Sequence, residues 1–322
     1  MKDLFMKAAL AAIILAGRAA GGPVPAAAQP LAGGEYCGAP LASARAAAFT
    51  LGLSTAVPAD KGFRLLEIES AARVDQLELL LEPFAKDEKK IMKRIARRPP
   101  YLVVRVKMDK LRSIFSVGAL LSPGRAYATG ALKEKPFTPP IEDSLFGGHS
   151  CVFASYGPYS GRERYGDVVF RLAPEKIAGG VWASRASGWH FLEDARGVDP
   201  RSRDSVSADE IAAFADTVFA GRDLPRVFRL MTVAFLRARP AGERDRLVDE
   251  LLRAPYGPAF YAIIDSERLG YLEAKIDGSV PLSAVTAIEV PPSALRAVLA
   301  WPEAEPYRKF ISPATDWSSR LN

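Results

Sequence analysis

The chain has 322 residues, of which 49% are hydrophobic and 25% are charged, and its formal net charge at pH 7 is +6. This composition is ordinary for a globular protein that buries a core. The mildly basic balance gives no support for a nucleic-acid partner, and no apolar run reaches the roughly 20 residues that a membrane-spanning helix needs.

The N-terminus has the pattern of a secretory signal peptide. A short basic segment precedes the apolar run Ala8–Gly17, and the sequence AAAQ at 26–29 offers a small-residue cleavage site. The alternative is an alanine-rich helix interrupted by Arg18. We expect residues 1–28 to be removed near Ala28, so that the mature chain is exported, periplasmic or secreted.

Export changes how the two cysteines are interpreted. Cys37 and Cys151 form an even count in an oxidising compartment, so a single disulfide between them is one of two interpretations. In the chain-entropy picture a loop of this length stabilises the fold by ~3–5 kcal/mol. The alternative is two unpaired thiols, with Cys151 a small core residue of a strand.

The mature chain divides into an arm and one domain. Residues 29–61 are rich in alanine, glycine and proline and are expected to form a linker or an arm. Residues 62–322 are expected to form a single α+β domain. Its N-terminal part, 70–98, is helical, and its core covers about 101–291.

Periodicity and capping signals give the expected elements. Strands are predicted at Phe63–Ile68, Tyr101–Met108, Cys151–Ser155, Tyr165–Leu172, Val181–Ser184, Ala259–Ile264, Leu269–Ile276 and Val285–Val290. Helices are predicted at Arg73–Leu81, Phe84–Arg98, Asp109–Phe115, Ser207–Ala220, Leu224–Arg239, Glu243–Arg253, Pro291–Leu299 and Tyr307–Ile311. Helices and strands occur in separate blocks without a βαβ alternation, which favours an α+β fold.

The densest basic run, Lys86–Arg98, has Ile91, Met92 and Ile95 at helical spacing. A solvated helix face explains this run better than a site for a polyanion. It contains no aromatic residues on which single-stranded bases could stack.

Several familiar chemical sites are missing from the sequence. It contains neither a phosphate-binding G-x-x-x-x-G-K-[ST] loop nor a G-x-G-x-x-G turn, and its histidines and cysteines have no zinc-site spacing. No metal site is therefore predicted. Gly148–Val152 begins like the G-x-S-x-G elbow of serine hydrolases, with Ser150 as nucleophile. Its last glycine is replaced by Val152 and a strand is expected to follow, so the hydrolase is the weakest reading.

A set of segments taken in order carries a more specific signal. They include DKLRSIFSVGALLSPGR, EDSLFGGHSCVFASYG, YGDVVFRLAPE and LGYLEAKIDGSVPLSAVTAIEVP. Over Lys107–Pro291 this order resembles uncharacterised bacterial proteins with an ADP-ribosyltransferase-like fold. The resemblance implies two small antiparallel sheets that form a cleft for NAD, with flanking helices.

The resemblance also assigns site residues. It makes Glu273 the catalytic carboxylate, because a fixed anion would stabilise the positive charge that develops at the ribose carbon as nicotinamide leaves. It makes Arg105 and Arg125 competing candidates for the residue that positions NAD, with Ser184 and Tyr165 as further NAD-binding candidates. Apart from the resemblance, Glu273 is a solvent-facing strand residue.

Two functions from different classes follow. The first is an exported NAD-dependent mono-ADP-ribosyltransferase, toxin-like, that modifies a protein target. The second is a non-catalytic exported binding module on the same scaffold.

Overall fold

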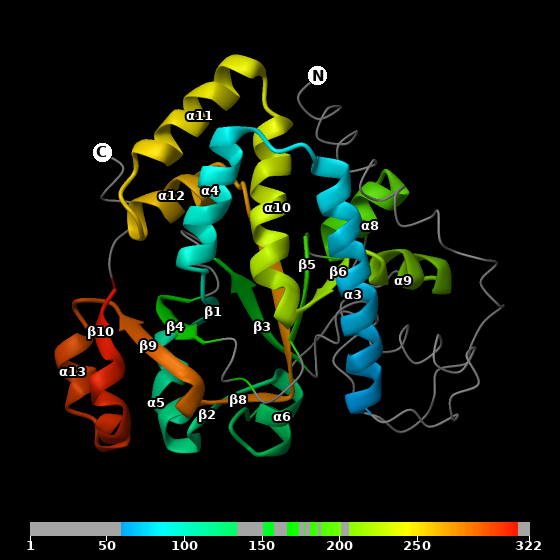
Figure 1. Cartoon of the computed structure of the whole chain (residues 1–322). Coiled ribbons are helices and arrows are strands. Elements are labelled where there is room, and N and C mark those ends of the chain that lie inside the picture. Colours follow the sequence, from blue (N-terminus) through cyan, green and yellow to red (C-terminus); the bar gives the residue numbers. More distant parts are fainter. Residues whose placement is uncertain are drawn as a thin grey trace.

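A single large β-sheet organises the molecule (Figure 1). The computed structural model describes residues 59–133, 151–157, 166–173, 177, 181–185, 188–200 and 206–314. Within them the sheet has eight strands, and all neighbouring strands are antiparallel except β10 and β9, which are parallel. In spatial order the strands are β10 (Ile311–Pro313), β9 (Val285–Val290), β4 (Val168–Leu172), β1 (Leu102–Val106), β3 (Cys151–Tyr156), β7 (Leu272–Asp277), β5 (Val181–Ser184) and β6 (Val218–Ala220).

Helices cover one face of this sheet and form the main core with it. Figure 1 shows α4 and α10 lying across the sheet, with α3 beside them and α11 and α12 above. Alternate strand residues such as Val104, Ala154 and Ala274 point into this core. The five helices are α3 (Ala59–Leu81), α4 (Lys86–Arg97), α10 (Leu224–Arg237), α11 (Ala241–Arg253) and α12 (Pro258–Ser266).

The opposite face carries a second apolar cluster towards its β5–β6 end. There α8 (Gly188–Arg196) and α9 (Ala208–Ala215) contribute Leu192 and Phe214 to a second, smaller core. Trp182 of β5 packs in the same cluster, with its ring 6.3 Å from that of Phe214. Further across this face the side chains become polar.

Shorter elements complete the described fold. A two-stranded ribbon pairs β2 (Ala119–Leu121) with β8 (Ser279–Pro281). The other helices in these ranges are α5 (Met108–Val117), α6 (Pro123–Ala128), α13 (Leu295–Leu299), η3 (Gly221–Asp223), η4 (Leu282–Ala284) and η5 (Pro302–Phe310). Tyr307 of η5 stacks on Phe115 of α5, with ring centroids 5.4 Å apart.

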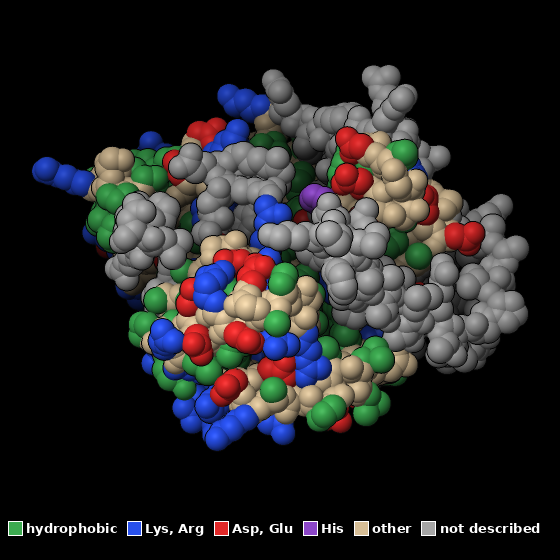
Figure 2. All heavy atoms as spheres, turned by 90° about the horizontal axis from the view of Figure 1, so that it is seen from above, with side chains coloured by type: hydrophobic (Ala, Val, Ile, Leu, Met, Phe, Trp, Pro, Cys, Tyr) green, Lys and Arg blue, Asp and Glu red, His purple; other side chains and the backbone are tan. Residues whose placement is uncertain are grey.

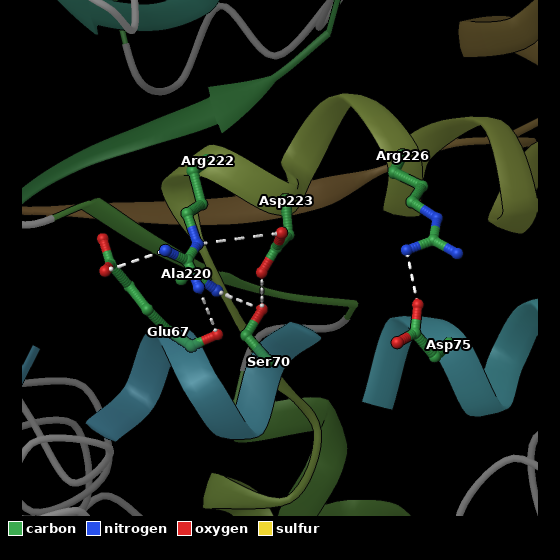
Figure 3. Close-up of polar contacts among 7 residues, drawn as sticks. All are labelled: Glu67, Ser70, Asp75, Ala220, Arg222, Asp223 and Arg226. Carbon is green, nitrogen blue, oxygen red and sulfur yellow. Dashed lines mark hydrogen bonds and ion pairs between the residues drawn. The ribbon is translucent and has the colours of Figure 1, made fainter. Parts of the chain in front are cut away.

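Side chains of α3 close the β6 edge of the sheet (Figure 3). The Arg73 guanidinium donates to the Val218 carbonyl at 2.8 and 3.1 Å, and the Ala220 amide donates to Ser70 Oγ at 2.9 Å. The Ser70 hydroxyl in turn donates to Asp223 Oδ2 at 2.6 Å. An edge strand exposes unpaired backbone groups to other chains. Here α3 satisfies them as a neighbouring strand would.

Many of the expected elements are confirmed. The helix expected at Phe84–Arg98 is α4, the strand expected at Val181–Ser184 is β5, and the helix expected at Asp109–Phe115 is α5, which runs on to Val117 and has Gly118 as its C-cap at φ 74°. The capping box expected at Ser207 and Glu210 opens α9, with both reciprocal bonds formed, at 2.8 and 3.2 Å. The mixture of helices and strands is likewise confirmed.

The expected arrangement of strands is wrong. Two small antiparallel sheets were predicted, whereas one eight-stranded mixed sheet and a short two-stranded ribbon form. The cleft that was expected between two small sheets depended on that arrangement and is not supported. The resemblance supplied that prediction, and the strand runs themselves carry no information on which strands share a sheet. Long-range pairing decides this, and it joins strands more than 100 residues apart, such as β3 and β7.

Two predicted strands are helical instead. Phe63–Ile68 lies inside α3, and Ala259–Ile264 lies inside α12, whose first residue is Pro258 at a position that favours helix initiation. Runs of six apolar residues do not distinguish a buried strand from a buried helix. Conversely, the helix expected through Ala220 ends at Ala215, and its last residues form β6.

Candidate functional site

The register of the sheet places three polar side chains in one row. Ser155 of β3 pairs with Glu273 of β7, and Glu273 pairs with Ser184 of β5. Residues directly opposite in antiparallel strands present their side chains on the same face. Glu273 is therefore flanked on both sides by buried serines, on the face of the sheet opposite the main core.

Two residues near Glu273 in the sequence hold its carboxylate, one in β7 and one directly before this strand. Lys275 Nζ forms an ion pair and hydrogen bond with Glu273 Oε1, and the Tyr271 hydroxyl donates to Oε2 at 3.4 Å. The three residues are spaced by two, so they lie on one face of the strand. The Glu273 side chain keeps 16% of its surface exposed, so solvent reaches it.

Lys275 is a fully buried cation. Its Nζ lies 3.8 Å from the centre of the Phe153 ring, in the geometry of a cation–π contact. Phe153 and Trp182 are its partners on the two flanking strands. A buried charge requires a counter-ion, and Glu273 supplies it.

The two candidate arginines lie in different places. Arg105 of β1 lies two residues beyond Val103, which pairs with Ser155, so Arg105 shares the face of Glu273 two strands away. Strands are spaced about 4.8 Å apart, so the lateral separation is roughly 10 Å. Its guanidinium donates to the Gly166 carbonyl at 3.4 Å.

Arg125 lies at the far end of β7 from Glu273. It is an exposed residue of α6, and its guanidinium covers the turn at Gly278, where a Cβ would approach it to 2.9 Å. Gly278 follows the last residue of β7. The structure thus brings Ser184 next to Glu273, places Arg105 on the same face, and does not bring Arg125 to the carboxylate.

Three residues named from the sequence fall outside the described ranges. These residues are Tyr165, Ser150 and Cys37. The contact of Tyr165 with NAD, the role of Ser150 as a hydrolase nucleophile and the disulfide between Cys37 and Cys151 therefore stay predictions. A strand, β3, begins at Cys151 directly after Ser150. A serine-hydrolase elbow instead leads into a helix.

A second ion pair lies on the same face. Arg171 Nε of β4 donates to Glu289 Oε1 of β9 at 2.7 Å, and both side chains are largely buried. Arg171 pairs with Val103 in the ladder, which puts it in line with Ser155 and Glu273. This face therefore carries a polar band with side chains on β5, β7, β3, β4 and β9, interrupted on β1 by the buried Val103.

Sequence reasoning missed the cation that contacts Glu273 and a second cation at the end of β5. Lys275 follows Glu273 by two residues, and that spacing in a strand was the available signal for their pairing. Arg185 follows Ser184 at the end of β5, and burial lowers its pKa to about 10. No sequence signal marks its burial, because the segment after β5 is irregular.

The basic run of α4 is partly used for packing. Ile91 and Ile95 are buried, and Arg94 donates to the carbonyls of Leu251, Leu252 and Ala254 at 2.6–2.7 Å. Arg94 thereby satisfies carbonyls at the C-terminal end of α11, where a cation is also favoured by the helix dipole. This agrees with a helix that has one buried and one solvated face.

Over the residues that the structure describes, no three histidine, cysteine, aspartate or glutamate side chains are grouped in a way that could hold a metal ion. In this part of the chain, no helix is long and apolar enough to cross a bilayer.

Comparison with known proteins adds no assignment. No protein-family model matches this sequence, and no curated protein is significantly similar to it. The functional argument therefore depends on the geometry of the residues and on the resemblance described in the sequence analysis.

Proposed function

We propose that this chain is an exported protein that cleaves NAD and transfers ADP-ribose to a protein target, with Glu273 as the catalytic carboxylate. The observation that carries the proposal is the position of Glu273: a solvent-accessible carboxylate, flanked by Ser155 and Ser184 and contacted by Tyr271. The resemblance of the surrounding segments to ADP-ribosyltransferase-like proteins supplies the reaction class.

The chemistry asks little of the protein beyond a well-placed anion. As the bond between the ribose carbon and nicotinamide breaks, its electron pair leaves with nicotinamide, and positive charge develops on the ribose. A nucleophile of the target then bonds to that carbon and loses a proton. The Glu273 carboxylate would stabilise the developing charge, and the adjacent serine hydroxyls would orient it.

Lys275 has two opposite effects in this scheme. Its ammonium group binds Glu273 Oε1 and so fixes the position of the carboxylate. The same charge partly neutralises the field of the carboxylate at the substrate. The hydrogen bond from Tyr271 holds the second oxygen and limits rotation of the group.

One observation favours the alternative of a non-catalytic binding module. Within the Glu273–Lys275 ion pair each charge is balanced by the other. An ion pair with a purely structural role has the same arrangement. The two functions predict different results once Lys275 has been replaced. A catalytic Glu273 is still needed for NAD cleavage, whereas a structural Glu273 is not.

The test is NAD hydrolysis by the mature chain, measured as released nicotinamide, in four proteins. Glu273→Gln alone leaves the buried Lys275 without its counter-ion and is expected to destabilise the fold. The double variant Glu273→Gln/Lys275→Met removes both charges, so its folded state should be more stable and its activity easier to compare with wild type. We expect both to lose ~100-fold or more in kcat, as for removal of a major electrostatic group. Lys275→Met, which keeps the carboxylate, should retain measurable activity.

Glu289→Gln is the matched control, because Glu289 is also an ion-paired carboxylate on this face. It should hydrolyse NAD at nearly the wild-type rate. Equal activity in wild type and the double variant, or no activity in any protein, would reject the catalytic assignment and favour the binding module.

A further inference from the structure

The outward side of α4 carries a stripe of cations. Its members recur at spacings of three or four residues, lie opposite the buried face of the helix and are all exposed: Lys86, Lys89, Lys93 and Arg97. The acidic residues of this helix are paired with other cations. Asp87 pairs with Lys90, and Glu88 pairs with Arg237 of α10. Within the described ranges the three lysines of the stripe form no ion pair.

The outward side of the neighbouring α3 is apolar instead. Ile68 is 65% exposed and Leu79 is 70% exposed, although the helix itself is packed on the domain. Together with the exposed Ala72 they lie opposite the face that buries Val74 and Leu77. A single exposed leucine needs no explanation, but large apolar side chains on one outward helix face indicate a contact surface.

The acidic side chains of α3 are neutralised within the protein. Each described carboxylate of this helix has an ion-pair partner: Glu67 with Arg222, Glu69 with Arg73, and both Asp75 and Glu78 with Arg226. Among the described side chains of α3 and α4, the charges left without an opposite partner are therefore cations of α4.

The two stripes belong to one outer face of the molecule. Figure 1 shows α3 and α4 on either side of α10, in the helical layer that covers one face of the sheet. The central helix α10 packs against both of them. Residues opposite the buried face of each helix point outward from this layer. The layer therefore has a broad outer face that is apolar along α3 and basic along α4.

We propose that this outer face binds the surface of a bilayer that contains anionic lipids. The α3 stripe enters the apolar boundary below the headgroups, and the α4 lysines contact the headgroups. Burial of apolar side chains and attraction between lysines and anionic lipids are the two contributions that hold peripheral proteins on membranes.

The shape and charge of the face favour a membrane over other occupants. A planar surface contacts both stripes at once, whereas one partner helix would have to reach two helices that α10 separates. A second copy of this chain, bound through the same face, would bring the same lysines and no anion. The sequence alone favoured a solvated face for the basic run of α4, and the exposed apolar stripe of α3 is the observation that the tertiary structure adds.

This inference goes beyond NAD cleavage and does not depend on it. Glu273 lies on the face of the sheet opposite the main helical layer. A chain bound to a bilayer through that layer would therefore turn Glu273 away from the membrane.

The binding test is co-sedimentation of the mature chain with vesicles. One set is made of phosphatidylcholine, and the other also contains phosphatidylglycerol, at roughly 30% of the lipid, as the anionic component. We expect at least about tenfold tighter binding to the anionic vesicles at about 0.1 M salt. Binding should weaken in about 0.5 M salt, because salt screens exposed charges.

Two variants separate the charged and the apolar contributions. Lys86→Gln/Lys89→Gln/Lys93→Gln should bind anionic vesicles about 100-fold more weakly, since each lysine near an anionic surface contributes about fivefold. Ile68→Ser/Leu79→Ser should bind about tenfold more weakly or less tightly still, because the apolar contact is lost. All of these side chains are exposed, so both variants should unfold near the wild-type temperature.

Lys107→Gln/Lys110→Gln/Lys133→Gln is the matched control. It removes the same total charge from exposed lysines outside the α4 stripe, two of them at the start of α5 and one after α6. Figure 1 shows α5 and α6 at the other end of the molecule from α4. This control should bind anionic vesicles as wild type does, which distinguishes a local lysine stripe from a general effect of net charge.

Binding to neither kind of vesicle, or equal binding by wild type and the α4 triple variant, would overturn the inference. So would a clear loss of thermal stability in Ile68→Ser/Leu79→Ser, since the α3 face would then be covered within the chain. A wild-type dimer in light scattering that this variant converts to a monomer would instead assign the face to a second copy.

The two proposals can fail separately. Glu273→Gln/Lys275→Met should bind anionic vesicles as wild type does, and the α4 triple variant should cleave NAD at the wild-type rate. Loss of NAD cleavage with vesicle binding intact would count against the catalytic role of Glu273 alone.

Discussion

Lys275 and Glu273 show how a single strand carries a buried charge. Lys275 has no exposed surface, and its charge is balanced by Glu273 and by the face of the Phe153 ring. Removing one member of such a pair typically costs about 3–5 kcal/mol, because the other charge stays buried. Any experiment on Glu273 must therefore separate catalysis from stability, which is why the double variant is needed.

Glu210 carries a prediction at the same scale. Its carboxylate accepts from Arg196 at 2.6 and 2.9 Å and from the Ser207 amide at 2.8 Å. The Arg196 hydrogen bonds are the main cause that lowers the pKa of Glu210 to about 2. Since the folded pKa lies below the unfolded value of about 4.3, this stabilisation is complete above that pH and is lost as the pH falls towards 2.

Glu210→Gln isolates the charge, because an amide oxygen can still cap the Ser207 amide. We expect wild type to be more stable by about 1 kcal/mol at pH 7, and the difference should disappear near pH 2. Urea unfolding at several pH values measures it. A difference that persists at pH 2 would contradict the assigned cause. The exposed pair Arg246–Glu250 offers a comparison in which Glu250→Gln should have little effect.

At the scale of elements, the docking of α3 determines how the sheet ends. Ser70 is fully buried and connects the Ala220 amide of β6 to Asp223 (Figure 3). Further ion pairs continue along the same interface, from Arg222 to Glu67 and from Arg226 to Asp75 and Glu78. The helix therefore replaces a ninth strand at this edge.

Ser70→Ala tests this arrangement. The substitution leaves the Ala220 amide and the Asp223 carboxylate without their shared partner, so unfolding should become easier by about 1–3 kcal/mol. Hydrogen exchange at the Ala220 amide should become faster than at the interior β5 amides. Ser116→Ala, which removes an exposed hydroxyl within α5, should change stability by less than about 0.5 kcal/mol. Equal effects of the two substitutions would rule out edge protection by Ser70.

At the scale of the whole molecule, the two faces of the sheet have different roles. One face is covered by five helices around the main core, and the other combines the small α8–α9 core with the polar band. Over the helices at the top of Figure 1, acidic and basic side chains are interspersed, as Figure 2 shows. Pairs such as Arg246–Glu250 and Arg239–Glu243 account for part of this pattern. The candidate site is therefore on the face of the sheet opposite the main helical layer.

The proposed export predicts a property of the whole chain. Expressed in a bacterium with its own N-terminus, the protein should appear outside the cytoplasm and begin near Gln29, as N-terminal sequencing would show. Replacing Ile13 and Ile14 in the apolar run by aspartate should keep the chain in the cytoplasm at full length. Cytoplasmic retention of the wild-type chain beginning at Met1 would contradict the proposal.

The sequence determined the features that depend on neighbours a few residues apart. The capping box of Ser207 and Glu210, the left-handed end of α5 at Gly118 and the buried stripe of α4 all follow from contacts at spacings of three or four. Such contacts are set by helix geometry alone, so the local pattern is sufficient. No such local contact marks Glu273. It became the candidate catalytic carboxylate only through the resemblance to a family.

Tertiary structure alone decided the rest. Packing made Phe63–Ile68 and Ala259–Ile264 helical, although their composition suits a strand equally well. Strand register placed Glu273 between Ser155 and Ser184, which precede it in the sequence by 118 (273 − 155) and 89 (273 − 184) positions. Burial of Lys275 arises from that same long-range assembly. Ladder pairing and desolvation act between segments that are distant along the chain, and no short sequence pattern encodes them.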